Sequence, residues 1–378
     1  MSSKPLPFAQ PVIDEAMIAA VSDTLRSRWV ASGPQVLAFE KALSDFVGGR
    51  PVRTFTSATA AMEAGLSILG VGPGDEVITP AQSFFASANV IERVGARVVF
   101  VDVDLASRNI DWAQAHGAVT PRTKALLPVH YNAPLDATTV AEFRSRHGVR
   151  VLEDAALAIG SRRGDRPVGA EGDLVSFSFH PNKNLTTIEG GALVLNTAAE
   201  AQVAERLRFH GIAKLPDGTR DVLEAGGKAN LSDVSARLGL AQLGQLDRWC
   251  RERARLATLY FEGLAGDEVL TPDCLPPRDN PGHSWNMFTI LLPLARMALA
   301  RRQFRAALQA EGIATGLSYE AIHLTSHFRS RGWREGQFPV SERIGRETVT
   351  LPLFVGMTDS DVARVCEVVR RALRSPPA

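Results

Sequence analysis

Lys183 lies in the polar segment Ser178-Phe179-His180-Pro181-Asn182-Lys183-Asn184, which directly follows a run of apolar residues. A lysine at the end of a buried strand, shielded from bulk water, has a lowered pKa and can act as an amine nucleophile. The hydroxyl of Ser178 could donate to a phosphate. A lysine in a loop is more often a solvated surface group, so this segment alone leaves both interpretations open.

Asp154 is the second candidate, in Glu153-Asp154-Ala155-Ala156 directly after the apolar residues 149–152. A carboxylate at the carboxyl end of a buried parallel strand lies where open α/β sheets bind ligands. Facing a protonated ring nitrogen, it would keep that nitrogen charged and make the ring an electron sink. The alternative is an acid in the cap or first turn of a helix.

The third candidate is the stretch Thr56-Ser57-Ala58-Thr59-Ala60-Ala61. Small residues at a helix start expose backbone N–H groups, and the positive end of the helix dipole suits a phosphate. The alternative is an ordinary capped helix. Each of the three features is ambiguous by itself, but their joint occurrence in one α/β domain, in this order, is harder to explain by the structural alternatives.

Short apolar runs separated by helix-length segments must position these residues. Such runs are typical of strands that are buried on both faces, so the pattern predicts an α/β domain with a three-layer, mostly parallel sheet. The predicted strands span residues 76–79, 97–101, 125–129, 149–152, 174–179 and 191–195.

The helical pattern suggests a division into two domains. Helices are predicted for residues 36–46 and 60–69, and a long helical stretch from Ser232 leads into a smaller C-terminal α+β domain. That domain is expected to contain a strand at 288–292 and helices at 301–311 and 359–373. We therefore predict a large domain over 1–245, including an N-terminal arm, and a small domain over 246–378. The glycine-rich segment 211–227 is predicted to be a long functional loop.

Composition excludes several classes of protein. The 378 residues carry 42 basic and 41 acidic side chains, and no basic stripe indicates a nucleic-acid partner. Three distant cysteines fit neither a disulfide framework nor a metal site. No signal peptide and no apolar stretch of about 20 residues is evident, so we expect a protein of the cytoplasm without a membrane partner.

The chain resembles the DegT/StrS-type sugar-nucleotide aminotransferases, which are fold type I pyridoxal-phosphate enzymes. The resemblance runs over nearly the whole length, and its motifs occur in the order of the family. They include Gly74-Asp75-Glu76-Val77-Ile78-Thr79-Pro80, Glu153-Asp154-Ala155-Ala156, Phe177-Ser178-Phe179-His180, Glu189-Gly190-Gly191 and Leu238-Gly239-Leu240-Ala241-Gln242-Leu243.

The resemblance implies a role for each matching residue in binding pyridoxal 5'-phosphate. Lys183 would bind the cofactor as a Schiff base and later shuttle the proton, and Asp154 would pair with the pyridine nitrogen. Backbone N–H groups around Ala58 and Thr59, with the Ser178 hydroxyl, would hold the phosphate. Phe84 would stack on the cofactor, although a core phenylalanine is an equally good interpretation of that residue.

The resemblance also implies the substrates and the assembly. The string 178–191 is closest to that of UDP-4-amino-4-deoxy-L-arabinose aminotransferases, which implies glutamate as amino donor and a 4-keto sugar nucleotide as acceptor. His180, Tyr319 and His323 are candidates for substrate contact, with His323 expected near the mouth of the site. Enzymes of this fold usually share their sites between two subunits, so a homodimer is expected.

Two departures from the family pattern bear on the substrate. Leu157 stands where the family usually has Gln or His in contact with the phenolic oxygen of the cofactor, and leucine cannot donate a hydrogen bond. Lys228 stands where many members have an asparagine that reaches the phosphate of the neighbouring subunit. Lys228 could contact that phosphate as a point charge, and Asn230 is a second candidate. Ala229 replaces the usual aromatic residue.

Three alternatives compete with this function. A pyridoxamine-phosphate dehydratase of the same fold has histidine in place of the Schiff-base lysine, so Lys183 argues against it. A regulatory cofactor-binding protein is disfavoured because no DNA-binding segment is visible. An aminotransferase acting on a cyclitol or on a ketone without a nucleotide remains open.

Overall fold

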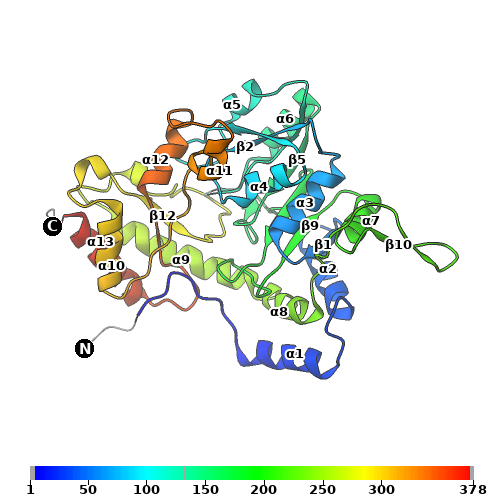
Figure 1. Cartoon of the computed structure of the whole chain (residues 1–378). Helices are drawn as coiled ribbons and strands as arrows, with labels where there is room; N and C mark the ends of the chain where they lie inside the picture. Colours follow the sequence, from blue (N-terminus) through cyan, green and yellow to red (C-terminus); the bar gives the residue numbers. More distant parts are fainter. Residues whose placement is uncertain (1–4, 132, 375–378) are drawn as a thin grey trace.

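The computed structural model of the chain describes residues 5–131 and 133–374 and has a seven-stranded sheet at its centre (Figure 1). The strand order is β1-β9-β8-β5-β4-β2-β3. The strands are β1 (Val52–Phe55), β2 (Glu76–Pro80), β3 (Arg97–Val101), β4 (Thr123–Leu126), β5 (Arg150–Asp154), β8 (Leu174–Ser178) and β9 (Gly191–Val194).

The sheet is mostly parallel, as predicted. Strands β3, β2, β4, β5 and β8 pair in parallel, whereas β9 runs antiparallel to both β8 and β1. Every residue of β2 and β8 is buried, as expected for strands that are covered on both faces of the sheet. The expected strands are all present, and β1 is an additional strand that the apolar pattern did not predict.

Helices cover both faces of the sheet and form the predicted three layers. Side chains of α3 (Ala58–Ile68), α4 (Ala86–Arg93) and α7 (Ala198–Leu207) pack on one face. The other face is covered by α2 (Pro34–Phe46), α5 (Trp112–Gly117), α6 (Ala137–His147) and α8 (Asp233–Leu243). Neighbouring residues of β9 alternate between the two faces, with Leu193 on one side and Val194 on the other, as the pleat of a strand requires.

The C-terminal part has its own apolar core around an antiparallel pair of strands. This part contains α9 (Leu246–Leu264), β12 (Phe288–Leu291), α10 (Arg301–Ala310), α11 (Ser326–Ser330), α12 (Pro339–Glu347), β13 (Thr348–Leu351) and α13 (Asp359–Leu373). Leu6 also packs in this core and forms a bridge to Ile313, although the sequence grouped the N-terminal arm with the large domain. The domain boundary between residues 245 and 246 stays a prediction. The first residue of the predicted large domain and the last residue of the predicted small domain lie outside the described residues.

Two local predictions were wrong. The segment 211–227 is not one loop, because β10 (Ile212–Lys214) and β11 (Arg220–Val222) pair as an antiparallel hairpin that projects from the body (Figure 1). Backbone pairing does not require the apolar alternation that we used to recognise strands. The helical stretch after Ser232 is two helices, α8 and α9, separated at Gly244 and Gln245.

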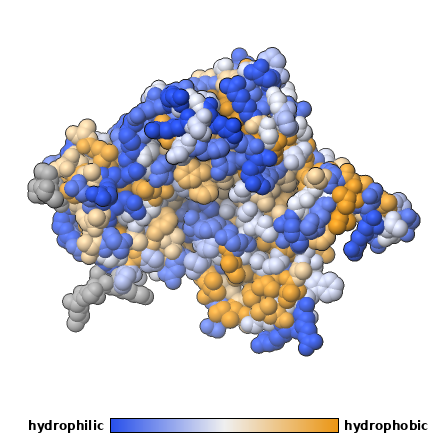
Figure 2. Space-filling view, viewed as in Figure 1, coloured by the Kyte–Doolittle hydropathy of each residue, from blue (hydrophilic) through white to orange (hydrophobic). Residues whose placement is uncertain are grey.

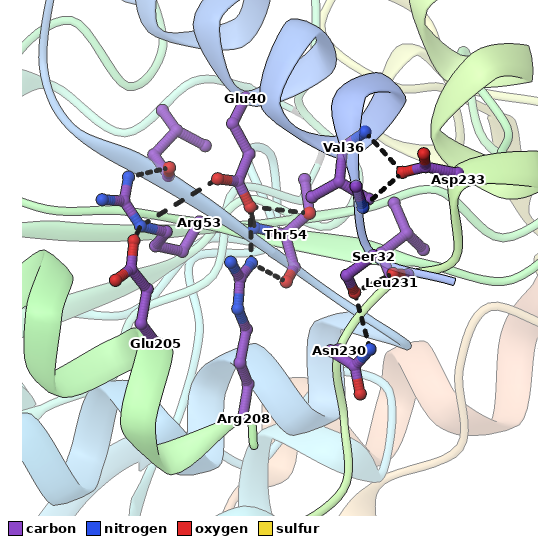
Figure 3. Close-up of polar contacts among 12 residues, drawn as sticks. Ser32, Val36, Glu40, Arg53, Thr54, Glu205, Arg208, Asn230, Leu231 and Asp233 are labelled. Carbon is purple, nitrogen blue, oxygen red and sulfur yellow. Dashed lines mark hydrogen bonds and ion pairs between the residues drawn. The ribbon is translucent and has the colours of Figure 1, made fainter. Parts of the chain in front are cut away.

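A buried carboxylate joins two helices that are far apart in the sequence (Figure 3). Asp233, in the first turn of α8, accepts hydrogen bonds from the backbone N–H groups of Gly33, Gln35 and Val36 at the start of α2. Nearby, Asn230 donates to Ser32 Oγ over 2.6 Å. These bonds fix the segment before α8 against the start of α2, since a helix start leaves N–H groups that need acceptors.

The described residues contain neither a membrane-spanning helix nor a cluster of metal-binding side chains. None of the helices between residues 5 and 374 that the structure describes is long and apolar enough to cross a membrane. Among the same residues, no group of three His, Cys, Asp or Glu side chains is placed to hold a metal ion.

Candidate active site

A cavity of about 370 Å³ lies where β5 and β8 end and α3 begins. It brings together most of the residues selected from the sequence, from segments more than 200 residues apart. Those that line it are Ala58, Thr59, Phe84, Asp154, Ser178, His180, Lys183 and Tyr319. Because the carboxyl ends of parallel strands meet at one edge of a sheet, the position is the one expected for a ligand in an open α/β fold.

Lys183 reaches into this cavity from the loop that follows β8. A turn in which the Lys183 N–H donates to the His180 carbonyl over 2.9 Å bends the chain back toward the sheet. Loss of hydration lowers the pKa of Lys183 to about 8, and the nearby carboxylate of Asp154 opposes that shift. The amine therefore has a substantial neutral fraction slightly above neutral pH, as a nucleophile or general base requires.

Asp154, at the end of β5, is held by two donors. Ser87 Oγ donates to Oδ2 over 2.7 Å, and the Ala156 backbone N–H donates to Oδ1 over 3.0 Å. Ser83 Oγ lies 2.8 Å from Ser87 Oγ and belongs to a residue that also lines the cavity. Sequence reasoning missed both serines. Their spacing of four residues beside Phe84 was visible, but nothing local connects them to a carboxylate 67 positions later.

The start of α3 forms one end of the cavity. Ser57 caps the helix by accepting from the Ala60 N–H over 3.1 Å, and Ala58 and Thr59 occupy the first turn, where backbone N–H groups have no acceptor within the helix. Gly191 passes so close that a Cβ there would lie 2.3 Å from the Ala58 nitrogen. Amides, the nearby Ser178 hydroxyl and a close glycine form a cradle for an anion.

The rim of the cavity is aromatic on one side and polar on the other. The ring of Phe84 is 53% exposed and meets the ring of Tyr319 edge-on, with 5.6 Å between centroids. His180 Nδ1 lies 2.8 Å from Asn182 Oδ1, and Glu189 lines the same side. Leu157 adds an apolar wall and packs with Tyr131 and Met287.

Three candidates from the sequence do not line the cavity. The placement of His323 near the mouth was wrong, because its side chain is fully buried and Nε2 lies 3.0 Å from Glu342 Oε1. Lys228 instead donates to Asn230 and lies over the ring of Phe209, 4.9 Å from its centroid. A role for Lys228 or Asn230 at a phosphate requires a second subunit and stays a prediction.

The arrangement suits a planar, phosphorylated pyridine cofactor. The cradle at α3 matches the phosphate, Asp154 can face a protonated ring nitrogen, and Lys183 supplies an amine that can bond to an aldehyde carbon. Phe84 presents an exposed aromatic face on the same cavity. These groups fit pyridoxal phosphate.

Solved structures of similar proteins include forms with this cofactor. A putative sugar aminotransferase from Streptococcus pneumoniae, Spr1654, has been solved in PLP and PMP forms; the PMP form is 28% identical, with a TM-score of 0.91 over 97% of this chain and 98% of that one. Helicobacter pylori PseC, an aminotransferase of pseudoaminic acid biosynthesis, is 25% identical, with a TM-score of 0.91 over 98% and 99%. DesI, solved with its TDP-sugar product, is 29% identical, with a TM-score of 0.87 over 98% and 94%.

The model of one protein family matches residues 11–370 of the sequence, which is nearly all of the chain. The expected fold, cofactor and reaction class are thereby confirmed. The chain belongs to the DegT/DnrJ/EryC1/StrS aminotransferase family, whose members are pyridoxal-phosphate-dependent sugar aminotransferases.

Proposed function

We propose that the protein transfers an amino group from glutamate to the C4 carbon of a keto sugar nucleotide. The observation that carries this proposal is the convergence of Lys183 and Asp154 on one cavity whose open side bears the polar side chains of His180, Asn182 and Glu189. Such side chains can bind the hydroxyl groups of a sugar. The TDP-sugar product bound to DesI supports a nucleotide-linked acceptor.

Lys183, Asp154 and the start of α3 have separate roles in the proposed reaction. Pyridoxal phosphate supplies a ring that accepts the electron pair released when a C–H bond next to the amino nitrogen breaks. Lys183 Nζ removes that proton and returns it to the neighbouring carbon, acting as general base and then as general acid. Asp154 keeps the proton on the ring nitrogen, while the first turn of α3 anchors the phosphate and thereby fixes the distance to Lys183.

We further propose that two copies of the chain form the working enzyme. Large exposed apolar side chains lie along α1 (Glu15–Arg26) and α2 and on the projecting hairpin, and Figure 2 shows apolar surface over these parts of the molecule. Phe84 is also exposed and lines the cavity. Among the described residues, the large exposed apolar side chains are Ile13, Ile18, Leu25, Trp29, Val30, Leu37, Phe84, Ile188, Phe209, Val222 and Leu223. Exposed apolar surface of this kind marks interaction sites, and a partner there would bring Lys228 and Asn230 toward a second cavity.

A spectral titration tests the proposed reaction. The purified protein with pyridoxal phosphate should absorb visible light through its bond to Lys183, and glutamate should remove that band while 2-oxoglutarate forms. A 4-keto sugar nucleotide should restore it. Lys183→Ala should lack the band, because it has no amine to bond to the cofactor. Lys124→Ala removes a surface lysine instead and should keep the band.

The acceptor panel separates the alternatives. It should contain 4-keto and 3-keto sugar nucleotides, a free keto sugar and a keto cyclitol. Restoration of the band only by the free sugar or the cyclitol would show that the acceptor carries no nucleotide. If glutamate removes the band and other amino donors do not, the assignment of glutamate as the donor is supported.

A further inference from the structure

One oxygen of the Asp154 carboxylate accepts a hydrogen bond from a short chain of two hydroxyl groups. Ser87 Oγ lies 2.7 Å from Asp154 Oδ2, and Ser83 Oγ lies 2.8 Å from Ser87 Oγ. Ser87 is fully buried in the first turn of α4, and Ser83 is 2% exposed just before that helix. A buried hydroxyl that donates to a carboxylate restricts the orientation of that carboxylate.

The number of hydroxyl protons determines which serine donates in each hydrogen bond. An ionised carboxylate can only accept hydrogen bonds, so the single Ser87 proton goes to Asp154. The bond between the two serines must then be donated by Ser83, because Ser87 has no second proton. Each donation polarises the next in a hydrogen-bonded chain, so the Ser83 proton strengthens the bond from Ser87 to Asp154.

The remaining bonds of Asp154 fix its orientation. The Ala156 N–H donates to Oδ1 over 3.0 Å, so each carboxylate oxygen has one donor from the protein and one lone pair left. Asp154 also lines the cavity, and those lone pairs are available there for a ring N–H. The helix α4, whose first turn carries Ser87, begins two residues after Phe84, so one short segment supplies both an aromatic face and the orientation of the carboxylate.

We propose that Ser87 is a positioning residue that holds the Asp154 carboxylate aimed at the pyridine nitrogen of the cofactor, with Ser83 as the donor to Ser87. This inference rests on the proposed function, because it assigns the role through the ring nitrogen. The serines themselves do not contact the reacting atoms.

The test replaces Ser87 with alanine and observes the ring nitrogen directly. With pyridoxal phosphate labelled with ¹⁵N in the ring, the ¹⁵N chemical shift of Ser87→Ala should move toward the unprotonated value at a pH where the wild type is protonated. A lost hydrogen bond to a charged group corresponds to about a tenfold effect or more. We expect about a tenfold higher dissociation constant for the cofactor and about a tenfold lower kcat, with KM for glutamate little changed.

Two further variants control for structural damage. Ser87→Thr keeps the hydroxyl and should restore the wild-type ¹⁵N shift. Ser83→Ala leaves the Ser87 donor in place and should give a smaller shift in the same direction. Thermal unfolding of each cofactor-free protein shows whether the fold is retained.

The outcomes are distinct for the two proposals. A folded Ser87→Ala with the wild-type ¹⁵N shift and cofactor affinity would overturn the positioning role, as would a Ser83→Ala effect larger than that of Ser87→Ala. A wild-type protein that binds the cofactor but aminates no keto substrate would instead count against the proposed function, while the ¹⁵N measurement could still decide the role of Ser87.

Discussion

Lys183 occupies an environment that disfavours its charge. Burial lowers its pKa from 10.5 to about 8, so the folded protein releases a proton that the unfolded chain keeps between those two values. Stability of the cofactor-free protein therefore rises as pH increases from 8 to 10.5. Below pH 8 the buried ammonium costs roughly 3 kcal/mol of folding free energy.

Replacing Lys183 with methionine should consequently stabilise the cofactor-free protein while abolishing turnover. At pH 7 we expect a gain of roughly 2–3 kcal/mol in the free energy of unfolding, and the gain should shrink toward pH 10.5. Urea unfolding at both pH values measures it. Lys124→Met, at an exposed position, should change stability little at either pH. A less stable Lys183→Met at pH 7 would contradict the buried-charge argument.

Capture of the cofactor should depend on the same titration. Only the neutral amine of Lys183 can attack the aldehyde carbon, so the rate of covalent attachment should rise with pH and reach half of its plateau near pH 8. Rapid mixing of the cofactor-free protein with pyridoxal phosphate, followed by absorbance, gives this profile. Lys183→Ala provides the baseline for changes in the free cofactor. A half-maximum near pH 10 would mean that the amine is solvated.

At the scale of elements, the phosphate cradle depends on how closely β9 passes the start of α3. A Cβ on Gly191 would lie 2.3 Å from the Ala58 nitrogen, and backbone atoms cannot move aside as a flexible side chain can. Gly191→Ala should displace the first turn of α3 and weaken cofactor binding at least about tenfold. Fluorescence titration with pyridoxal phosphate measures the affinity.

Gly72→Ala is the matched control, because a Cβ at Gly72 would meet no atom within 4 Å. That variant should bind the cofactor like the wild type. Equal affinity of Gly191→Ala and Gly72→Ala would show that the cradle does not depend on the close approach of β9.

The capping of α2 by α8 yields a prediction about stability. Asp233 is fully buried and accepts from three backbone N–H groups at the start of α2, whereas Asp14 caps α1 through one bond to the Met17 N–H near the surface. Asp233→Ala should cost about 3 kcal/mol, and Asp14→Ala about 1 kcal/mol. Urea unfolding gives both values, and similar losses would refute the anchoring role of Asp233.

At the scale of the whole molecule, the hairpin β10–β11 stands away from the body and carries Val222 and Leu223, which are 61% and 55% exposed. If the hairpin packs against a second copy, the double variant Val222→Asp, Leu223→Asp should shift the protein toward monomer and weaken cofactor binding. Analytical ultracentrifugation at micromolar concentration measures the shift. Thr219→Asp, in the exposed turn, adds a charge as a control. An unchanged mass for the double variant would exclude the hairpin from the interface.

Much of the fold was predictable because it rests on short-range patterns. Continuous apolar runs marked six of the seven strands, and helical spacing marked α13 with its observed bounds. The strand β1 was not predicted because its sequence Val-Arg-Thr-Phe alternates with polar residues and forms no apolar run. The hairpin strands were not predicted because each has three residues, which is too short to show a pattern. In both cases pairing with another segment, not local composition, determines the structure.

The sequence by itself determined the chemical groups of the site. A lysine after a buried strand, a carboxylate at the end of another and small residues at a helix start could be recognised one by one, and their order matched a family. Only the tertiary structure decided which groups meet. It joined Ser87 to Asp154 and placed His323 against Glu342, because the packing of elements that are distant in the sequence, which no local pattern encodes, sets these contacts.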